Sequence, residues 1–79
     1  MAIFAREIIG RDVVDSHQER LGQLKDLVFD TPTGTIVALK VSIEQNLDPS
    51  KLPWTVLDGY VQIPVEEINR IAGKVHLKR

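Results

Sequence analysis

The sequence predicts an all-β fold, a small β-barrel of five or six short strands with one short helical turn. Turn-forming residues recur at short spacing along the 79 residues, which favours several short strands. Two stretches, 33–43 and 60–65, place their apolar residues on one face of an extended chain. Closing such a sheet into a barrel also removes the strand edges that an open sheet would expose.

The first two expected strands lie within residues 10–16 and 19–30. The first centres on the β-branched pair Val13-Val14, flanked by polar residues. The second is longer and its alternation is broken, because its apolar residues have opposite parities: Leu24 with Val28, and Leu27 with Phe29. A bulge or sharp twist near Lys25–Asp26 would reconcile the two sets, and Gly22 permits local bending.

A hairpin connects the second expected strand to a third over residues 33–43. In the link, Pro32 suits the second position of a type I turn and Gly34 can take a left-handed conformation. The carboxylate of Asp30 can bond to nearby amides. The third strand is predicted to have two distinct faces: Val37, Leu39, Val41 and Ile43 inward, and Ala38, Lys40 and Ser42 outward.

Residues 44–59 break the strand pattern, because Pro49 and Pro53 exclude a central strand. The segment is nevertheless too apolar for an ordinary solvated loop. Trp54, the only tryptophan, has two interpretations that are compatible. It is either a lid that plugs an open barrel end, or an anchor at a protein interface, where tryptophan is enriched among energetic hot spots.

The pattern then returns to strand at residues 60–65, with Val61, Ile63 and Val65 on one face. Residues 65–73 show apolar residues at helical spacing and end at Gly73, which predicts one or two helical turns. Residues 74–78 are expected to form a last short strand. Its inward side chains would be Val75 and Leu77.

Composition excludes several classes of protein. With 10 basic and 11 acidic side chains and a net charge of −1, the chain lacks the basic surface that general nucleic-acid binding requires. It has no cysteine, so a disulfide framework and thiolate chemistry are excluded. His17 and His76 lie far apart without an obvious third ligand, and we expect no metal site and no cofactor.

The length fits a single domain over residues 1–79. Arg6 and Glu7 interrupt the apolar start, which is too short for a signal peptide or a membrane span, and a cytoplasmic protein is expected. A core of this size contributes only about 3–5 kcal/mol in many small scaffolds. Because disulfides are excluded and a metal is not expected, we predict a homodimer.

No set of residues predicts catalysis. Asp15, Ser16 and His17 are the residue types of a hydrolase triad, but consecutive residues cannot form the relay, and a polar turn is expected instead. Glu66 and Glu67 fit the first turn of a helix better than a catalytic pair. The isolated glycines do not form a phosphate-binding loop. We expect that the protein is not an enzyme.

Several short motifs, in order, resemble the PRC-barrel family over roughly residues 5–78. They run from "AREIIGRDVVDS" through "ERLGQLKDLVFDTPTGTIVAL" to "IPVEEINRIAGKVHL". The resemblance implies a small, closed or partly closed barrel without enzymatic activity, known from the reaction-centre H subunit, the ribosome-maturation factor RimM and short stand-alone proteins. The stand-alone members are implicated as adaptors in cell division, and this chain resembles that type most.

The sequence therefore predicts a protein–protein interaction or adaptor module. Its expected interface combines apolar anchors with an aromatic rim: Leu47, Leu52, Trp54 and Leu57, with Tyr60 at the edge. The alternative is a ribosome-maturation or RNA-assembly accessory role, supported by the resemblance to RimM and by the basic end "KVHLKR". An enzyme or metal protein, and a structural part of a larger complex, remain further alternatives.

Overall fold

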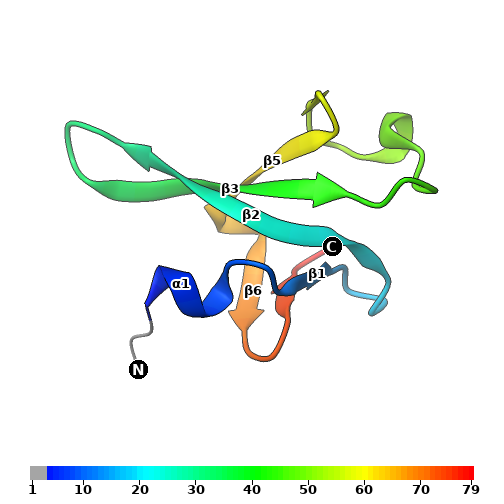
Figure 1. Ribbon diagram of the computed structural model, residues 1–79, viewed down its shortest axis with the longest axis horizontal. Coiled ribbons are helices and arrows are strands. Elements are labelled where there is room, and N and C mark those ends of the chain that lie inside the picture. Colours follow the sequence, from blue (N-terminus) through cyan, green and yellow to red (C-terminus); the bar gives the residue numbers. More distant parts are fainter. Residues whose placement is uncertain (1–3) are drawn as a thin grey trace.

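Strands dominate the computed structural model, which describes residues 4–79. These residues form a seven-stranded sheet in the order β4-β5-β3-β2-β1-β7-β6 (Figure 1). The elements along the chain are α1 (Ala5–Ile8), β1 (Asp12–Val14), β2 (Arg20–Asp30), β3 (Thr35–Ile43), η1 (Pro49–Lys51), β4 (Val56–Leu57), β5 (Tyr60–Pro64), η2 (Val65–Glu67), β6 (Ile68–Ile71) and β7 (Val75–Leu77).

The all-β prediction is confirmed, but the expected strand count was too low. The additional strands are the two-residue β4, inside the apolar segment, and β6, where a helix was expected. Neighbouring strands are antiparallel except β1 and β7, which are parallel. The sheet curls around its core without closing, because its end strands β4 and β6 do not pair with each other.

Strand β2 contains the predicted bulge. Leu24 pairs with Val41, and Asp26 pairs with Lys40, so Lys25 is the extra residue in β2. The bulge reverses the parity of the strand. Leu24 is fully buried and Leu27, on the far side of the bulge, also packs against the core.

Gly22 lies where β2 turns from one neighbour to the other. It pairs with Ile43 of β3 and with Val13 of β1, and the pairing with β1 shifts by one residue at this point. A Cβ atom on Gly22 would lie 1.7 Å from the carbonyl oxygen of Ser42. Only glycine lets the two backbones approach this closely.

A second irregularity, in the pairing of β2 with β3, makes part of the predicted inward face of β3 wrong. Val28 pairs with Ala38 and Phe29 with Ile36, so Val37 is an extra residue without a partner in β2. Val37 is consequently exposed and Ala38 is buried, the reverse of the expectation from simple alternation. The remaining inward residues of β3 were predicted correctly for Leu39 and Val41, which are buried, while Ile43 packs partly buried against the core.

The β2–β3 loop turns as expected at Gly34, whose φ is 73°. Its N–H donates to the carbonyl of Asp30 at 2.7 Å. The Asp30 carboxylate accepts from the hydroxyl of Thr33 at 2.6 Å, whereas an amide donor was expected. The hairpin projects beyond the rest of the sheet, with its loop at the far end (Figure 1).

The predicted helix at residues 65–73 is wrong beyond its first turn. Val65–Glu67 form a single 3-10 turn, and the chain then becomes extended at Ile68. Strand β6 pairs with β7, including Ile68 with Leu77 and Ile71 with Val75. Pairing along β7 outweighs the helical spacing, which residues with β-branched side chains support only weakly.

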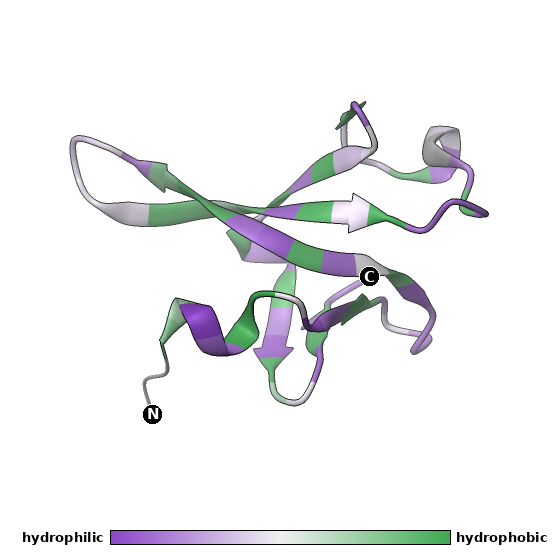
Figure 2. Cartoon of the chain, in the orientation of Figure 1, coloured by the Kyte–Doolittle hydropathy of each residue, from purple (hydrophilic) through white to green (hydrophobic). Residues whose placement is uncertain are grey.

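One apolar core lies inside the curled sheet, and apolar and polar residues alternate along β2 and β3 around it (Figure 2). The last strand was predicted correctly, because Val75 and Leu77 are buried. The short helix α1 was not predicted. Its Ile8 joins the core, and the Phe4 N–H donates to the Glu7 carboxylate at 2.9 Å.

Candidate functional site

The apolar segment 44–59 folds against the core. Leu47, Leu52, Trp54 and Val56 are all partly buried there. The first three belong to the interface expected from the sequence, and the structure places them as cover for one end of the core. Their contact with a partner protein stays a prediction.

The middle of this segment is ordered by a local cap. Asp48 precedes η1, and its Oδ1 accepts from the Ser50 N–H at 3.0 Å and from the Ser50 hydroxyl at 2.7 Å. These bonds favour the ionised carboxylate. The hydroxyl bond, and then the amide bond, lower the pKa of Asp48 below its ordinary value.

Trp54 is held from two sides. Its ring packs against the core, and the guanidinium carbon of Arg79 lies 5.9 Å from the ring centroid. Arg79 also forms an ion pair with Glu67 at the end of η2. The contacts within the chain account for most of the tryptophan surface, as expected for a lid.

The other two expected interface residues lie on the outer face of the sheet. Asp58 and Gly59 both have positive φ, 55° and 79°, which defines a two-residue type I′ turn between β4 and β5. Leu57 and Tyr60 flank this turn as a cross-strand pair and point to the same side. Their exposed fractions are 72% and 37%.

These two side chains belong to an open pocket of about 460 Å³, which we call the Tyr60 pocket. Besides Leu57 and Tyr60 it is lined by Lys40, Thr55, Asp58 and Gln62. The Lys40 ammonium lies 4.6 Å from the centroid of the Tyr60 ring. A cation over an aromatic face is a favourable contact of about 0.5–1 kcal/mol at exposed sites.

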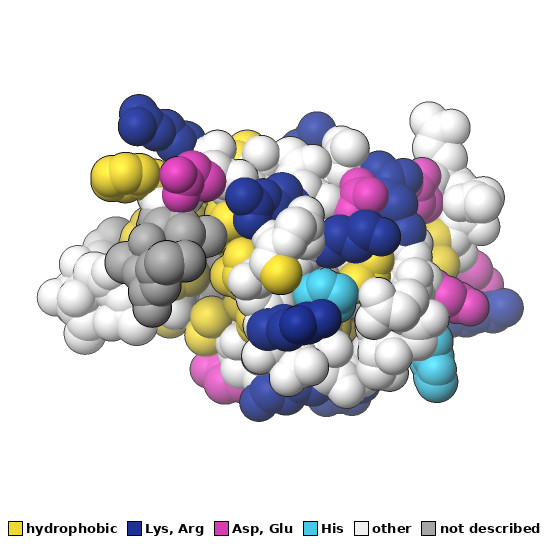
Figure 3. All heavy atoms as spheres, turned by 90° about the horizontal axis from the view of Figure 1, so that it is seen from below, with side chains coloured by type: hydrophobic (Ala, Val, Ile, Leu, Met, Phe, Trp, Pro, Cys, Tyr) yellow, Lys and Arg dark blue, Asp and Glu magenta, His cyan; other side chains and the backbone are white. Residues whose placement is uncertain are grey.

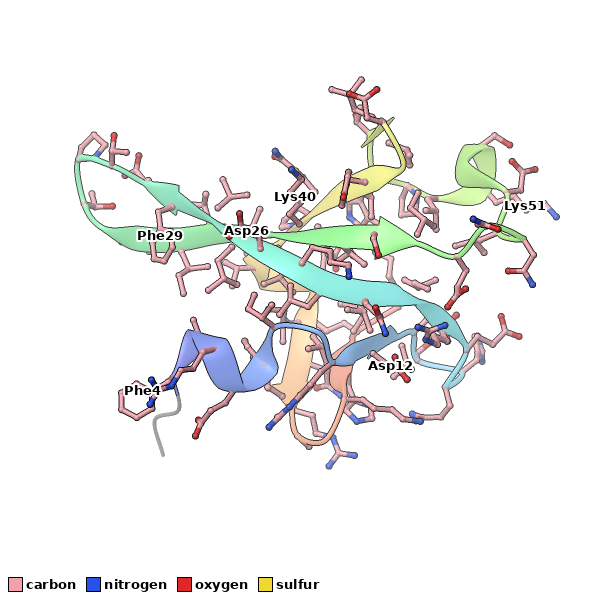
Figure 4. The ribbon with its side chains drawn as sticks, in the orientation of Figure 1. Phe4, Asp12, Asp26, Phe29, Lys40 and Lys51 are labelled. Atoms are coloured by element: carbon pink, nitrogen blue, oxygen red, sulfur yellow. The ribbon has the colours of Figure 1, made fainter. Side chains whose placement is uncertain are left out.

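Within the described part of the chain, Lys40 forms no ion pair, although a carboxylate residue lies directly opposite on β2. Asp26 is its cross-strand neighbour, and both side chains are labelled in Figure 4, yet Lys40 turns toward the tyrosine. Within residues 4–79 the ion pairs involve Arg20 and Arg79 instead. The Tyr60 pocket therefore presents an ammonium group beside exposed apolar surface.

A second hollow, the apolar groove, lies on the inner side of the open sheet. It has a volume of about 210 Å³ and nine apolar residues line it, from α1, β2, β3, η2 and β6. Ile36, Leu39, Ile68 and Ile71 form its walls, and Phe4 lies at its rim. The sequence did not indicate this groove. The second irregularity of β3 was not predicted, so Ile36 was not expected to face inward. Ile71 was assigned to the expected helix and not to a strand.

The other residues considered for catalysis or metal binding have local structural roles or do not gather into a site. The Asp15 carboxylate accepts from the backbone N–H groups of His17 and Glu19 at 2.8 and 2.9 Å, which makes the polar turn that was expected. Within residues 4–79, no three His, Asp or Glu side chains gather where they could hold a metal ion. No polar or charged side chain of this range is buried.

Basic side chains are frequent on the face formed by α1, β1, β6 and β7 (Figure 3). Arg70, Lys74 and Lys78 are exposed there. Arg11 donates to the carbonyl of Ala72, which ties it to the β6–β7 loop. None of the helices within residues 4–79 has the length and apolar character to cross a membrane.

Comparison with known proteins identifies one family. The model of the PRC-barrel domain family matches residues 1–79. None of the curated proteins matches the chain.

Proposed function

Because the chain belongs to the PRC-barrel domain family over residues 1–79, we propose that it is a non-enzymatic adaptor that binds another protein and pairs with a second copy of itself. The observation that supports partner binding best is the Tyr60 pocket. It combines a largely exposed leucine, a half-exposed tyrosine and a lysine without an acidic partner within residues 4–79. Exposed apolar groups beside a polar rim are typical of protein interfaces.

The chemistry of the pocket defines the partner. An apolar side chain of the partner would cover Leu57 and Tyr60, and a neighbouring carboxylate would reach Lys40. The carboxylate of Asp58 lies at the turn end of the pocket, so a partner carboxylate is favoured only at the Lys40 end. The partner segment is therefore an exposed loop or strand with an apolar residue followed closely by Asp or Glu.

Strand β4 adds a second means of recognition. It is the end strand of the sheet, so among the described residues one side of its backbone has no neighbouring strand. In the β4–β5 hairpin the pair that closes the turn is Leu57 and Tyr60, which leaves the N–H and C=O of Val56 directed to the free edge. An extended partner segment can hydrogen-bond there while its side chains enter the Tyr60 pocket.

The resemblance to stand-alone family members gives the first partners to test. Those members are implicated as adaptors in cell division, so we propose a protein of the division machinery. Any such partner must carry the apolar and acidic segment described above.

Capture of partners from a lysate of the native cell tests the proposal when it is run with paired variants. Lys40→Glu should abolish capture of the specific partner, because it places a carboxylate where the partner's carboxylate would bind. Leu57→Ser should reduce it strongly. Lys51→Glu is the matched control, since Lys51 is an exposed lysine outside the pocket (Figure 4) and its change should leave capture intact. Equal capture by Lys40→Glu and Lys51→Glu would overturn the pocket as the binding site.

The basic face supports RNA binding as a second candidate function. Arg70 and His76 are cross-strand neighbours, and Lys74 and Lys78 flank β7. Binding of labelled RNA at two salt concentrations separates the candidates. Affinity that falls steeply with salt, and falls further in a Lys74→Glu/Lys78→Glu variant, would favour RNA over a protein partner.

A further inference from the structure

We propose that the apolar groove, together with the base of the β2–β3 hairpin, forms the contact with a second copy of this chain. The inference rests on the proposed function, because it assigns a surface to the self-pairing stated there. It concerns the inner side of the sheet. The Tyr60 pocket lies on the outer side, since Lys40 alternates with the buried Leu39 and Val41.

The groove continues along the hairpin. Phe29 of β2 is the cross-strand partner of Ile36, which lines the groove. Cross-strand partners point to the same side of a sheet, so Phe29 extends the groove toward the hairpin loop. Its exposed fraction is 52%, and that of Phe4 at the opposite rim is 66%. Two half-exposed phenylalanines therefore flank one apolar hollow.

The chain exposes more surface than is typical for a compact monomer of its mass. The accessible surface is 5425 Å² for a chain of 8.9 kDa. A compact monomer of this mass exposes about 4,800 Å², so the excess is about 600 Å². The molecule measures 34 × 26 × 19 Å, and the projecting hairpin lies along its long direction (Figure 1).

This excess matches what a small specific dimer buries. The lower end of specific interfaces is about 1,200 Å² in total, or about 600 Å² for each partner. A two-fold axis makes the same patch meet itself, so each hairpin would place Phe29 in the groove of the other copy. The residues that line the groove are all apolar, and the Arg6 guanidinium lies beside it, 5.1 Å from the centroid of the Phe4 ring.

A second copy would also add buried apolar surface to a core that is small by itself. Within residues 4–79, ten of the twelve buried apolar residues form one cluster, and the groove opens directly beside it, because Ile8 and Leu39 belong to both. A partner Phe29 in the groove would extend that cluster across the two-fold axis. Burying a phenylalanine is among the larger stabilising contributions that one side chain can make, which matters in a domain of this size.

Sedimentation equilibrium and light scattering of the purified chain test the inference. The wild type should have twice the mass of one chain, and Phe29→Asp should weaken self-association about 30-fold or more, as expected for a central interface residue. Leu57→Asp is the matched control, because it places the same charge at an exposed apolar position on the outer face. It should leave the dimer intact.

Two outcomes would overturn the inference: a wild type that is monomeric at millimolar concentration, or a dimer that Leu57→Asp dissociates and Phe29→Asp does not. If Phe29→Asp fails to fold, dilution of the wild type followed by NMR gives the answer. The resonances of Phe29, Ile36 and Ile71 should shift on dilution, whereas those of Leu57 and Tyr60 should not. Shifts confined to Leu57 and Tyr60 would refute the proposed face.

The test also separates this inference from the proposed function. Phe29→Asp should still capture a partner protein through the Tyr60 pocket. A monomeric wild type that captures a partner would overturn the groove as a dimer contact and retain the adaptor. A dimer that forms through the groove, with a Tyr60 pocket that captures no partner, would retain the groove as the dimer contact and overturn the adaptor.

Discussion

Strand β2 has two very different ends. Around Gly22 the backbone is packed so closely against β3 that a single added carbon would overlap the Ser42 carbonyl. Around Phe29 the same strand leaves half of an aromatic side chain in solvent (Figure 4). The bulge at Lys25 lies between the two ends and changes which residues face inward.

This difference shows how one strand can serve stability and recognition at once. Residues near Gly22 are fixed by contacts within the chain, so changes there should lower the free energy of unfolding. Phe29 itself is half exposed, so changes at this residue should alter association and leave folding nearly unchanged. The following predictions test that division from the largest expected effect to the smallest.

The largest effect is expected for Gly22→Ala. The new Cβ would lie 1.7 Å from a backbone oxygen, so β2 and β3 must separate at the bend. We expect a loss of more than about 3 kcal/mol in the free energy of unfolding, at the upper end for overpacked sites. Urea denaturation followed by circular dichroism measures it. A loss below 1 kcal/mol would show that the bend can relax.

Leu24→Ala and Phe29→Ala form a matched pair on either side of the bulge. Leu24 is completely buried, and its truncation should cost about 3 kcal/mol, within the range for core leucines. Phe29→Ala should cost less than about 1 kcal/mol in the monomer, since much of the ring is already in water. Denaturation must be measured at low protein concentration, where dimer formation does not contribute. Equal losses would contradict the proposed division of β2.

Gly34→Ala probes the hairpin loop beyond Phe29. The position has a φ of 73° and open space around it, so only the backbone conformation opposes a side chain. We expect a loss of about 1 kcal/mol, and a smaller one for Gly34→Asn, which tolerates the left-handed region. Thermal unfolding of the two variants provides the comparison. A Gly34→Ala protein as unstable as Gly22→Ala would mean that the loop is also tightly packed.

The smallest effect is expected for Ser50→Ala, which lies in the apolar segment away from β2. The hydroxyl and amide of Ser50 lower the pKa of Asp48, so their stabilisation is complete above about pH 4 and is lost as the pH falls through the lowered pKa. Removing the hydroxyl should raise that pKa toward its ordinary value. NMR titration of the Asp48 carboxyl carbon measures the shift. An unchanged pKa would mean that the amide bond alone is responsible.

Much of the fold could be predicted because local rules agree with the final contacts. The bulge near Lys25–Asp26 was predictable, since the two parities of apolar residues in β2 cannot otherwise face one core. The buried alternation in β7 and the left-handed Gly34 followed for similar reasons. In each case the residues of a single strand or turn were enough to predict its conformation.

The errors arose where pairing between distant strands decides the conformation. The second irregularity of β3 exposes Val37, and no residue of that strand signals it by itself. The strand at Ile68–Ile71 is formed by β7, against its own helical spacing. Both errors concealed the apolar groove, because its walls include Ile36 and Ile71.

The structure brings together two of the five residues of the expected interface, and their contact with a partner stays a prediction. Leu57 and Tyr60 lie together at an exposed pocket, and the type I′ turn at Asp58–Gly59 that presents them could have been recognised from its sequence. The role of Lys40 could not, because its approach to Tyr60 depends on the register between β3 and β5. Trp54 packs against the core and is partly buried, a position that apolarity alone cannot distinguish from an interface.

The parallel pair of β1 and β7 has a consequence for synthesis of the chain. Val13 pairs with Val75, so β1 must wait for its partner until the residues between them have been made. Until β7 has left the ribosome, β1 has a free edge and the core lacks Val75 and Leu77. The core can therefore be completed only after β7 is available, and an unpaired strand edge leaves a nascent chain prone to aggregation until then.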